Sequence, residues 1–155
     1  MKKYGLILLF IMLGLSVFIW FLRQEPSEEI LQEGRINNQY HQAVDWSKAG
    51  VDARRYQIDY QEVRDAVANG AKLYDARDAV SYQLGHVEFS ENIPLMNLEL
   101  GKLPDLDKET PIYVYCKTSM CSDKSVKLFR QSGFQHVYDL GSLEQVEAIG
   151  GKIDW

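Results

Sequence analysis

An uncharged run of 19 residues, from Tyr4 to Leu22, separates the N-terminus from the rest of the 155-residue chain. As a helix, this run would be about 28 Å long, close to the roughly 30 Å hydrocarbon core of a bilayer. It has no polar face, which argues against a buried helix of a globular protein. The run therefore predicts a transmembrane anchor over residues 1–23, with residues 4–22 in the lipid bilayer.

A cleaved secretory signal peptide is the alternative to an anchor. Signal peptides have a shorter apolar core of about 7–15 residues and small residues at a cleavage site just after it. Here the run ends in the bulky sequence IWFL. This ending favours an anchor that stays attached.

Positive charges at the two ends of the run predict its orientation. Lys2 and Lys3 precede it, whereas Arg23 alone follows. The positive-inside tendency then places the N-terminus in the cytoplasm and the rest outside, as a single-pass protein of the cytoplasmic membrane.

The residues after Arg23 hold all 22 acidic residues and 14 of the 17 basic ones, a net charge of −8. This charge disfavours nucleic acid as a partner.

Beyond the anchor, the chain divides into a polar stretch and a regular one. Residues 24–55 are rich in acidic residues and turn formers, and they predict a juxtamembrane spacer. Over residues 56–155, strand-like and helix-like patterns alternate. The expected strands are 56–58, 72–76, 91–95, 111–116 and 136–140, and the expected helices include 60–69, 78–84 and 122–132. Such alternation predicts a small three-layer α/β domain with a mainly parallel sheet.

The two cysteines of the chain, Cys116 and Cys121, follow the clearest strand. Cys116 would lie at the carboxyl end of that strand, where parallel α/β domains bind ligands. Backbone N–H groups at the start of a helix near Ser122, together with Lys117 and Lys124, would favour its thiolate and could hold an anion. The same position also suits a small buried hydrophobic side chain.

Other uses of the cysteine pair fit its spacing less well. Two cysteines separated by four residues, with no histidine nearby, do not supply the four ligands of a structural zinc site. A thioredoxin-type motif needs two residues between its cysteines. We therefore expect neither a metal nor a cofactor.

Four segments between residues 56 and 146 resemble the rhodanese domain, the fold of persulfide-forming sulfurtransferases. Their sequences, in chain order, are LYDARDAVSYQLGH, GHVEFSENIP, IYVYCKTSMCS and GFQHVYDLGS. The resemblance implies that Cys116 accepts a sulfane sulfur from a donor, carries it as a persulfide and passes it to a thiol acceptor. Residues of the same loop would bind the substrate, namely Lys117, Thr118, Ser119, Met120 and Ser122.

The resemblance also implies roles for three residues near the site. Asp75 and Arg77 would pair at the end of their strand and support the neighbouring loops. His86 would stabilise a turn through a hydrogen bond rather than act as an acid–base catalyst.

The loop departs from the family pattern at two positions. That pattern often reads Cys-x-x-Gly-x-Arg-Ser, and here Ser119 stands at the glycine and Cys121 at the arginine. A serine would be strained there if its φ were positive. Loss of the arginine removes a bidentate anion clamp, which argues against thiosulfate as a substrate. Cell-cycle-type phosphatases and arsenate reductases end a longer loop in arginine, where this chain has Ser122, so those activities are disfavoured.

Two classes of function fit these residues. The first is a membrane-anchored sulfurtransferase or thiol-redox protein, in which Cys121 is a resolving thiol that attacks the persulfide on Cys116. In a variant of this hypothesis, Cys121 only fills the space of the arginine and Cys116 acts alone. The second is a non-catalytic rhodanese-like module that binds a partner at the membrane surface. Retention of Cys116 favours the first class, and loss of the glycine and arginine favours the second.

Overall fold

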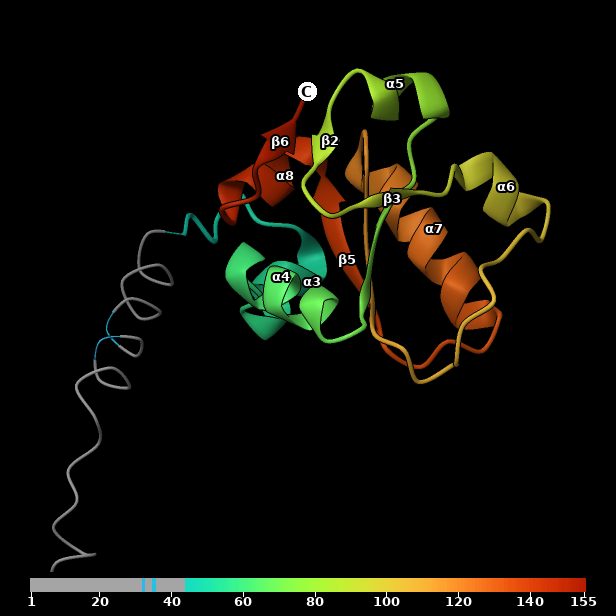
Figure 1. Ribbon diagram of the computed structural model, residues 1–155, viewed down its shortest axis with the longest axis horizontal. Coiled ribbons are helices and arrows are strands. Elements are labelled where there is room, and N and C mark those ends of the chain that lie inside the picture. The colour runs from blue at the N-terminus through green and yellow to red at the C-terminus, as the bar shows by residue number, and fades with distance from the viewer. Residues whose placement is uncertain (1–31, 33–34, 36–43) are drawn as a thin grey trace, which may run out of the picture. The chain divides into compact units, whose positions relative to one another are not determined.

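The computed structural model describes residues 32, 35 and 44–155. These include a compact α/β unit that extends to Trp155 (Figure 1). In the described residues, no helix is both long and apolar enough to cross a membrane. The predicted anchor at residues 4–22 lies outside the described residues, as does most of the predicted spacer.

A four-stranded parallel sheet forms the centre of the unit, with the strand order β3-β1-β4-β5. Its strands are β1 Lys72–Asp75, β3 Glu91–Asn92, β4 Ile112–Cys116 and β5 Val137–Ser142. Every residue of β4 is buried, as expected for an apolar, β-branched and aromatic strand in the middle of a parallel sheet. The predicted α/β fold with a mainly parallel sheet is confirmed.

Helices cover both faces of this sheet (Figure 1). One face carries α3 Val51–Tyr56, α4 Tyr60–Ala68 and α8 Leu143–Ala148, and the other carries α6 Leu95–Glu99 and α7 Ser119–Gln131. Successive side chains of a strand point to opposite faces. Accordingly, Tyr113 and Tyr115 of β4 join the core beneath α4 and α8, whereas Val114 and Cys116 join the core beneath α7.

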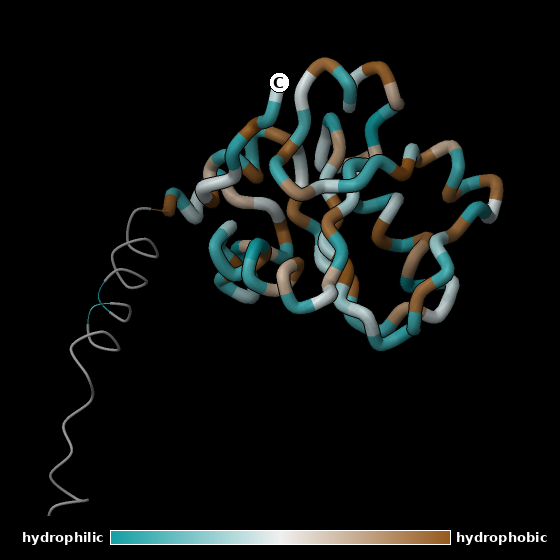
Figure 2. Tube along the Cα trace, viewed as in Figure 1, coloured by the Kyte–Doolittle hydropathy of each residue, from teal (hydrophilic) through white to brown (hydrophobic). Residues whose placement is uncertain are grey.

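Local sequence explains where two of the helices begin. The Asp59 carboxylate accepts a hydrogen bond from the Glu62 amide at 2.8 Å and so caps α4. Asp78 caps α5 Ala79–Gln83 in the same way, through the Ser81 amide at 3.0 Å. Along α4, hydrophilic and hydrophobic residues are interspersed (Figure 2), and Tyr60 and Val63 are the residues buried in the core.

A second, smaller sheet was not predicted from the sequence. In it, β2 His86–Val87 pairs antiparallel with β6 Ile153–Asp154, near the C-terminus. The short helix α6 was also not predicted. Two-residue strands and a five-residue helix carry too few residues to show a periodic pattern.

The structure moves the predicted boundary between spacer and domain. Residues 44–55, expected in the spacer, belong to the compact unit, and Ala49 and Ala53 are buried in its core. The predicted strand at 56–58 is absent, because Tyr56 ends α3 and Gln57 takes a left-handed conformation with φ 57°. Gly50 lies directly against β5, where a Cβ atom at position 50 would overlap the carbonyl oxygen of Leu140.

Candidate active site

Cys116 is the last residue of β4, a central strand of the sheet, and its exposed fraction is 1%. Its side chain packs in the core between the sheet and α7. The chain leaves the sheet at this residue and enters α7 after Lys117 and Thr118. Cys116 therefore lies where parallel α/β domains place their ligands.

Helix α7 begins at Ser119, earlier than the predicted start near Ser122. Thr118 is its N-cap, with an extended backbone and an Oγ1 atom that accepts a hydrogen bond from the Cys121 amide at 3.3 Å. Ser122 is fully buried, and its hydroxyl donates to the Ser119 carbonyl at 3.0 Å. The predicted six-residue loop is therefore a two-residue connection followed by the first turn of a helix.

A disulfide joins Cys116 to Cys121. The two Cα atoms are 5.8 Å apart, within the roughly 4.4–6.8 Å range that a disulfide requires. Because α7 begins early, Cys121 lies in its first turn, next to the end of the strand that carries Cys116. Cys116 is buried, whereas Cys121 is partly exposed. A reagent in solution therefore reaches the pair from the Cys121 side.

The five residues predicted to bind substrate lie in different environments. Four of them are exposed, namely Lys117, Thr118, Ser119 and Met120, the last to 82%. Ser119 donates its hydroxyl proton to Oε1 of Gln145 at 2.5 Å, which ties the start of α7 to α8. Ser122 is buried beneath them. Among these five, Ser122 is the one whose side chain a ligand cannot contact directly.

Two expectations for this turn are corrected by the structure. Ser119 is the first residue of a right-handed helix, so the strain expected of a serine with positive φ does not arise. Lys124 forms an ion pair with Glu99 of α6, so its charge is shared with a carboxylate. Lys117 is thus the exposed lysine adjacent in sequence to Cys116.

Asp75 and Arg77 form a tight pair at the carboxyl end of β1. Asp75 is fully buried, and its carboxylate accepts hydrogen bonds from Nη2 of Arg77 at 2.6 Å and from Nε at 2.9 Å. The same Nη2 donates to the carbonyl of Gly85 at 2.6 Å. The pair therefore lies between the strand end and the turn after α5.

His86 lies in β2, at the turn that Arg77 supports. Its Nδ1 is 3.1 Å from the carbonyl oxygen of Tyr82, and its ring stacks on the Tyr82 ring with centroids 4.0 Å apart. Tyr82 in turn donates its hydroxyl proton to the Ser90 carbonyl at 2.6 Å. These contacts hold a turn together.

A family model described as a rhodanese-like domain matches residues 59–148, more than half of the chain. The chain belongs to the rhodanese family. The matched residues run from the N-cap of α4 to the end of α8 and include Asp75, Arg77 and both cysteines.

Two curated relatives share about a third of their aligned residues with this rhodanese-like domain. An uncharacterized protein of Bacillus subtilis, YqhL, is 32% identical over 84 residues, which cover 54% of this chain and 64% of that protein. The thiosulfate sulfurtransferase GlpE of Pseudomonas paraeruginosa is 32% identical over 80 residues, which cover 52% of this chain and 72% of that enzyme. The chain thus spans less than two thirds of the length of the Bacillus relative.

A solved structure agrees with the fold. The crystal structure of a rhodanese-like domain from the Alr3790 protein of Anabaena superimposes with a TM-score of 0.51 and 32% identity. The match covers 56% of this chain and the whole of that domain.

Sequence reasoning missed two residues that support the site. Oε1 of Gln145 in α8 accepts two hydrogen bonds, one from the Ser119 hydroxyl and one from the Ser142 amide. The Tyr115 hydroxyl accepts a hydrogen bond from the Val87 amide at 3.0 Å and lies 3.0 Å from the Ser90 hydroxyl. Burial, followed by the nearby Asp75 carboxylate, raises the pKa of Tyr115. The hydroxyl is therefore a permanent hydrogen-bonding group that joins β4 to the turn around β2.

The acidic, histidine and cysteine side chains do not gather into a metal site anywhere in the described part of the chain. Both sulfurs are also engaged with each other. The chemistry that the arrangement can support is that of a cysteine pair at the start of a helix.

Proposed function

We propose that this rhodanese-like domain is a sulfurtransferase that carries a persulfide on Cys116, with Cys121 as the resolving thiol. The observation that carries the proposal is the bond between the two sulfurs at the carboxyl end of β4. Membership of the rhodanese family supports the sulfur chemistry, and a relative named as a thiosulfate sulfurtransferase supports it further.

In the first step, the reduced thiolate of Cys116 attacks the outer sulfur of a donor R–S–S⁻. The bond between the two donor sulfurs breaks, R–S⁻ leaves, and Cys116 holds the transferred sulfur as a persulfide. The first N–H groups of α7 lack partners within the helix and can stabilise the negative charge on that sulfur. Lys117 adds a positive charge beside it.

In the second step, the thiolate of Cys121 attacks Sγ of Cys116. The bond from Sγ to the transferred sulfur breaks, that sulfur takes a proton from the solvent and leaves as HS⁻, and the Cys116–Cys121 disulfide forms. Two equivalents of an external thiol then reduce the disulfide and restore both thiols. Alternatively, an acceptor thiol takes the sulfur from Cys116 before Cys121 reacts.

The absence of an arginine at position 121 favours a donor with little negative charge. An arginine there would clamp an oxyanion bidentately, whereas Cys121 offers no positive charge. We therefore expect an organic persulfide to be a better donor than thiosulfate.

The intact mass of the reduced protein after brief exposure to cysteine persulfide tests the proposal. The wild type and Cys121→Ser should gain one sulfur atom on Cys116, and Cys121→Ser should retain it longer. Cys116→Ser should gain none. As a matched control, Gln131→Ser changes an exposed residue at the far end of the same helix and should load as the wild type does. If Cys116→Ser loads as much sulfur as the wild type, the proposal is wrong.

A non-catalytic binding module is the second candidate function. Burial of Cys116 and the missing glycine and arginine of the loop favour it. It predicts that neither the wild type nor the variants gain sulfur from cysteine persulfide or from thiosulfate, even when both thiols have been reduced and can be alkylated.

We also propose that residues 1–23 anchor the domain in the cytoplasmic membrane, with residues 44–155 outside the cytoplasm. The uncharged run from Tyr4 to Leu22 and the lysines before it support this. Protease added to intact cells, or to spheroplasts where an outer membrane is present, should remove the domain. Full protection of the domain would overturn the orientation.

A further inference from the structure

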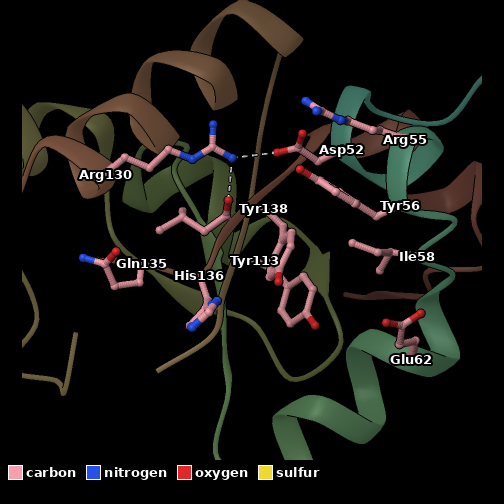
Figure 3. Close-up of a pocket in the computed structure, with 11 residues that line it drawn as sticks. Asp52, Arg55, Tyr56, Ile58, Glu62, Tyr113, Arg130, Gln135, His136 and Tyr138 are labelled. Carbon is pink, nitrogen blue, oxygen red and sulfur yellow. Dashed lines mark hydrogen bonds and ion pairs between the residues drawn. The ribbon is translucent and has the colours of Figure 1, made fainter. Parts of the chain in front are cut away.

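A pocket of about 470 Å³ lies beside the edge strand β5 (Figure 3). Helices α3 and α4 form one wall of the pocket, and the end of α7 and the start of β5 form the other. Its volume is in the range of small-molecule sites in proteins.

The pocket is separate from the cysteine pair. Tyr113 lines it and precedes Cys116 by three residues on β4, a separation of about 10 Å along a strand. The two side chains also belong to cores on opposite faces of the sheet. A ligand in the pocket would therefore not touch the sulfur site.

Three tyrosines form an aromatic wall in the pocket, two of them stacked and the third edge to face. The rings of Tyr113 and Tyr138 stack with centroids 5.2 Å apart and planes inclined by 22°. The Tyr56 ring meets Tyr138 edge to face, with centroids 5.9 Å apart. Stacked rings of this kind favour a planar ligand that extends the stack. They do not surround a volume as the walls of a cage for a round cation do.

Charged groups lie at the two ends of this wall (Figure 3). At one end are Arg55, Arg130 and the Asp52 carboxylate that pairs with Arg130, and at the other is Glu62. The Arg55 guanidinium already lies over the Tyr56 ring, 5.2 Å from its centroid, so a cationic ligand would be repelled from that face. Burial, followed by Glu62, raises the pKa of Tyr113 to about 12, which keeps this hydroxyl protonated.

The backbone of the edge strand is not open to an added peptide strand at this point. Nη2 of Arg130 donates to the Val137 carbonyl at 2.6 Å, and the Asp52 carboxylate accepts from the Asp139 amide at 2.9 Å. Arg130 and Asp52 are joined to each other at 2.9 Å. A ligand therefore meets side chains here, which favours a small molecule over a peptide.

From this geometry we infer that the pocket binds a planar aromatic amine that carries an acidic group. The ring system stacks on the tyrosines, the acidic group binds the Arg55 and Arg130 end, and the amine donates to Glu62. A mononucleotide with an amino-substituted base has this chemistry. This site is independent of the sulfur chemistry at Cys116.

Calorimetric titration of the full-length chain, held in a non-ionic detergent, tests the inference with adenosine 5′-monophosphate as the probe. We expect a dissociation constant below about 1 mM. Adenosine and inorganic phosphate should each bind at least about tenfold more weakly, since each lacks half of the contacts. Tyr138→Ala should weaken binding of the nucleotide about tenfold through loss of stacking.

The matched pair Arg55→Gln and Arg54→Gln decides whether the pocket is responsible. Both arginines are exposed on α3, but only Arg55 lines the pocket. Arg55→Gln should raise the dissociation constant about tenfold, and Arg54→Gln should leave it unchanged. A folded wild type that does not bind the nucleotide, equal losses in the two variants, or equal binding of adenosine would each overturn the inference.

Discussion

The carboxyl end of the sheet and its outer edge are each held by an aspartate–arginine pair. At the carboxyl end, Asp75 and Arg77 lie two residues apart, and their side chains are 0% and 10% exposed. At the outer edge, Asp52 and Arg130 lie 78 residues apart, and their side chains are 8% and 49% exposed. The first pair is local and dry, whereas the second is distant and half open to water.

The two pairs therefore have different structural roles. The Asp75–Arg77 pair fixes the strand end and the turn beside the cysteine site, through the Gly85 carbonyl. The Asp52–Arg130 pair attaches α3 to the edge strand and occupies two backbone groups that would otherwise be open. Uncovered edge strands pair with other chains, so the second pair protects the domain from association.

Removal of α3, which carries Asp52, should have the largest effect on the stability of the domain. A fragment that starts at Tyr56 lacks buried Ala49 and Ala53 and leaves the Asp139 amide without Asp52. We expect it to aggregate or to unfold without cooperativity, because core area is lost and the edge strand is exposed. A fragment that starts at Ala43 is the control and should melt cooperatively in a calorimetric scan. Equal cooperativity and melting temperatures of the two fragments would show that α3 is not part of the folding unit.

The next largest effect is expected at the dry pair. Asp75→Ala leaves the Arg77 guanidinium, which is 10% exposed, without its carboxylate. Loss of one partner of a buried pair typically costs about 3–5 kcal/mol of unfolding free energy. Urea unfolding measures this loss. Asp78→Ala, which removes the exposed cap of α5, is the local control and should cost about 1 kcal/mol. Similar losses in the two variants would contradict the role given to Asp75.

A smaller loss is expected at the half-exposed pair. Asp52→Ala leaves the Asp139 amide unsatisfied, while Arg130 can turn to water. We expect a loss of about 1–3 kcal/mol in urea unfolding, mostly from the buried amide. Arg130→Gln should cost less than Asp52→Ala. The reverse order would mean that the ion pair, rather than the amide, dominates at this edge.

The smallest expected effect is a pH dependence of the unfolding free energy, caused by Asp139 on the same edge strand. Burial raises the pKa of the Asp139 carboxyl above the ordinary 3.8, partly opposed by a hydrogen bond from Ser122. The folded state therefore binds this proton more tightly than the unfolded chain does, so the carboxylate destabilises the fold increasingly as pH rises above 3.8 through the raised pKa. Asp139→Asn should be more stable than the wild type at neutral pH, and the difference should vanish below pH 3.8.

Asp105→Asn is the control for the change of net charge, because Asp105 is exposed. It should show no such pH-dependent gain in urea unfolding across the same range. If Asp139→Asn is less stable than the wild type at neutral pH, the ionised carboxylate stabilises the fold, and the assigned direction is wrong.

The contrast between the two pairs also explains what the sequence could predict. The Asp75–Arg77 pair, the caps at Asp59 and Asp78 and the buried strand β4 all depend on neighbours within a few residues. Periodicity and capping chemistry are visible at that range. Periodicity therefore predicted β4 and the parallel sheet from the sequence, whereas the Asp75–Arg77 pair was expected from the resemblance to the rhodanese domain.

The features that the sequence did not predict depend on distant partners. The segment around α3 is short, with small and charged residues, and its burial depends on contacts with β5. Helix α7 was expected to begin near Ser122, whereas its N-cap is Thr118. Ser122 is instead buried within the first turn of this helix.

The release of sulfide in a single turnover tests the central claim, that Cys116 and Cys121 act as one unit, most directly. The protein is reduced, freed of reductant and mixed with cysteine persulfide, and sulfide and alkylatable thiols are measured together. The account predicts about one sulfide per wild-type chain as the Cys116–Cys121 disulfide forms, and none from Cys121→Ser, which retains its persulfide. Equal sulfide release from Cys121→Ser and the wild type, with both wild-type thiols still alkylatable, would contradict it.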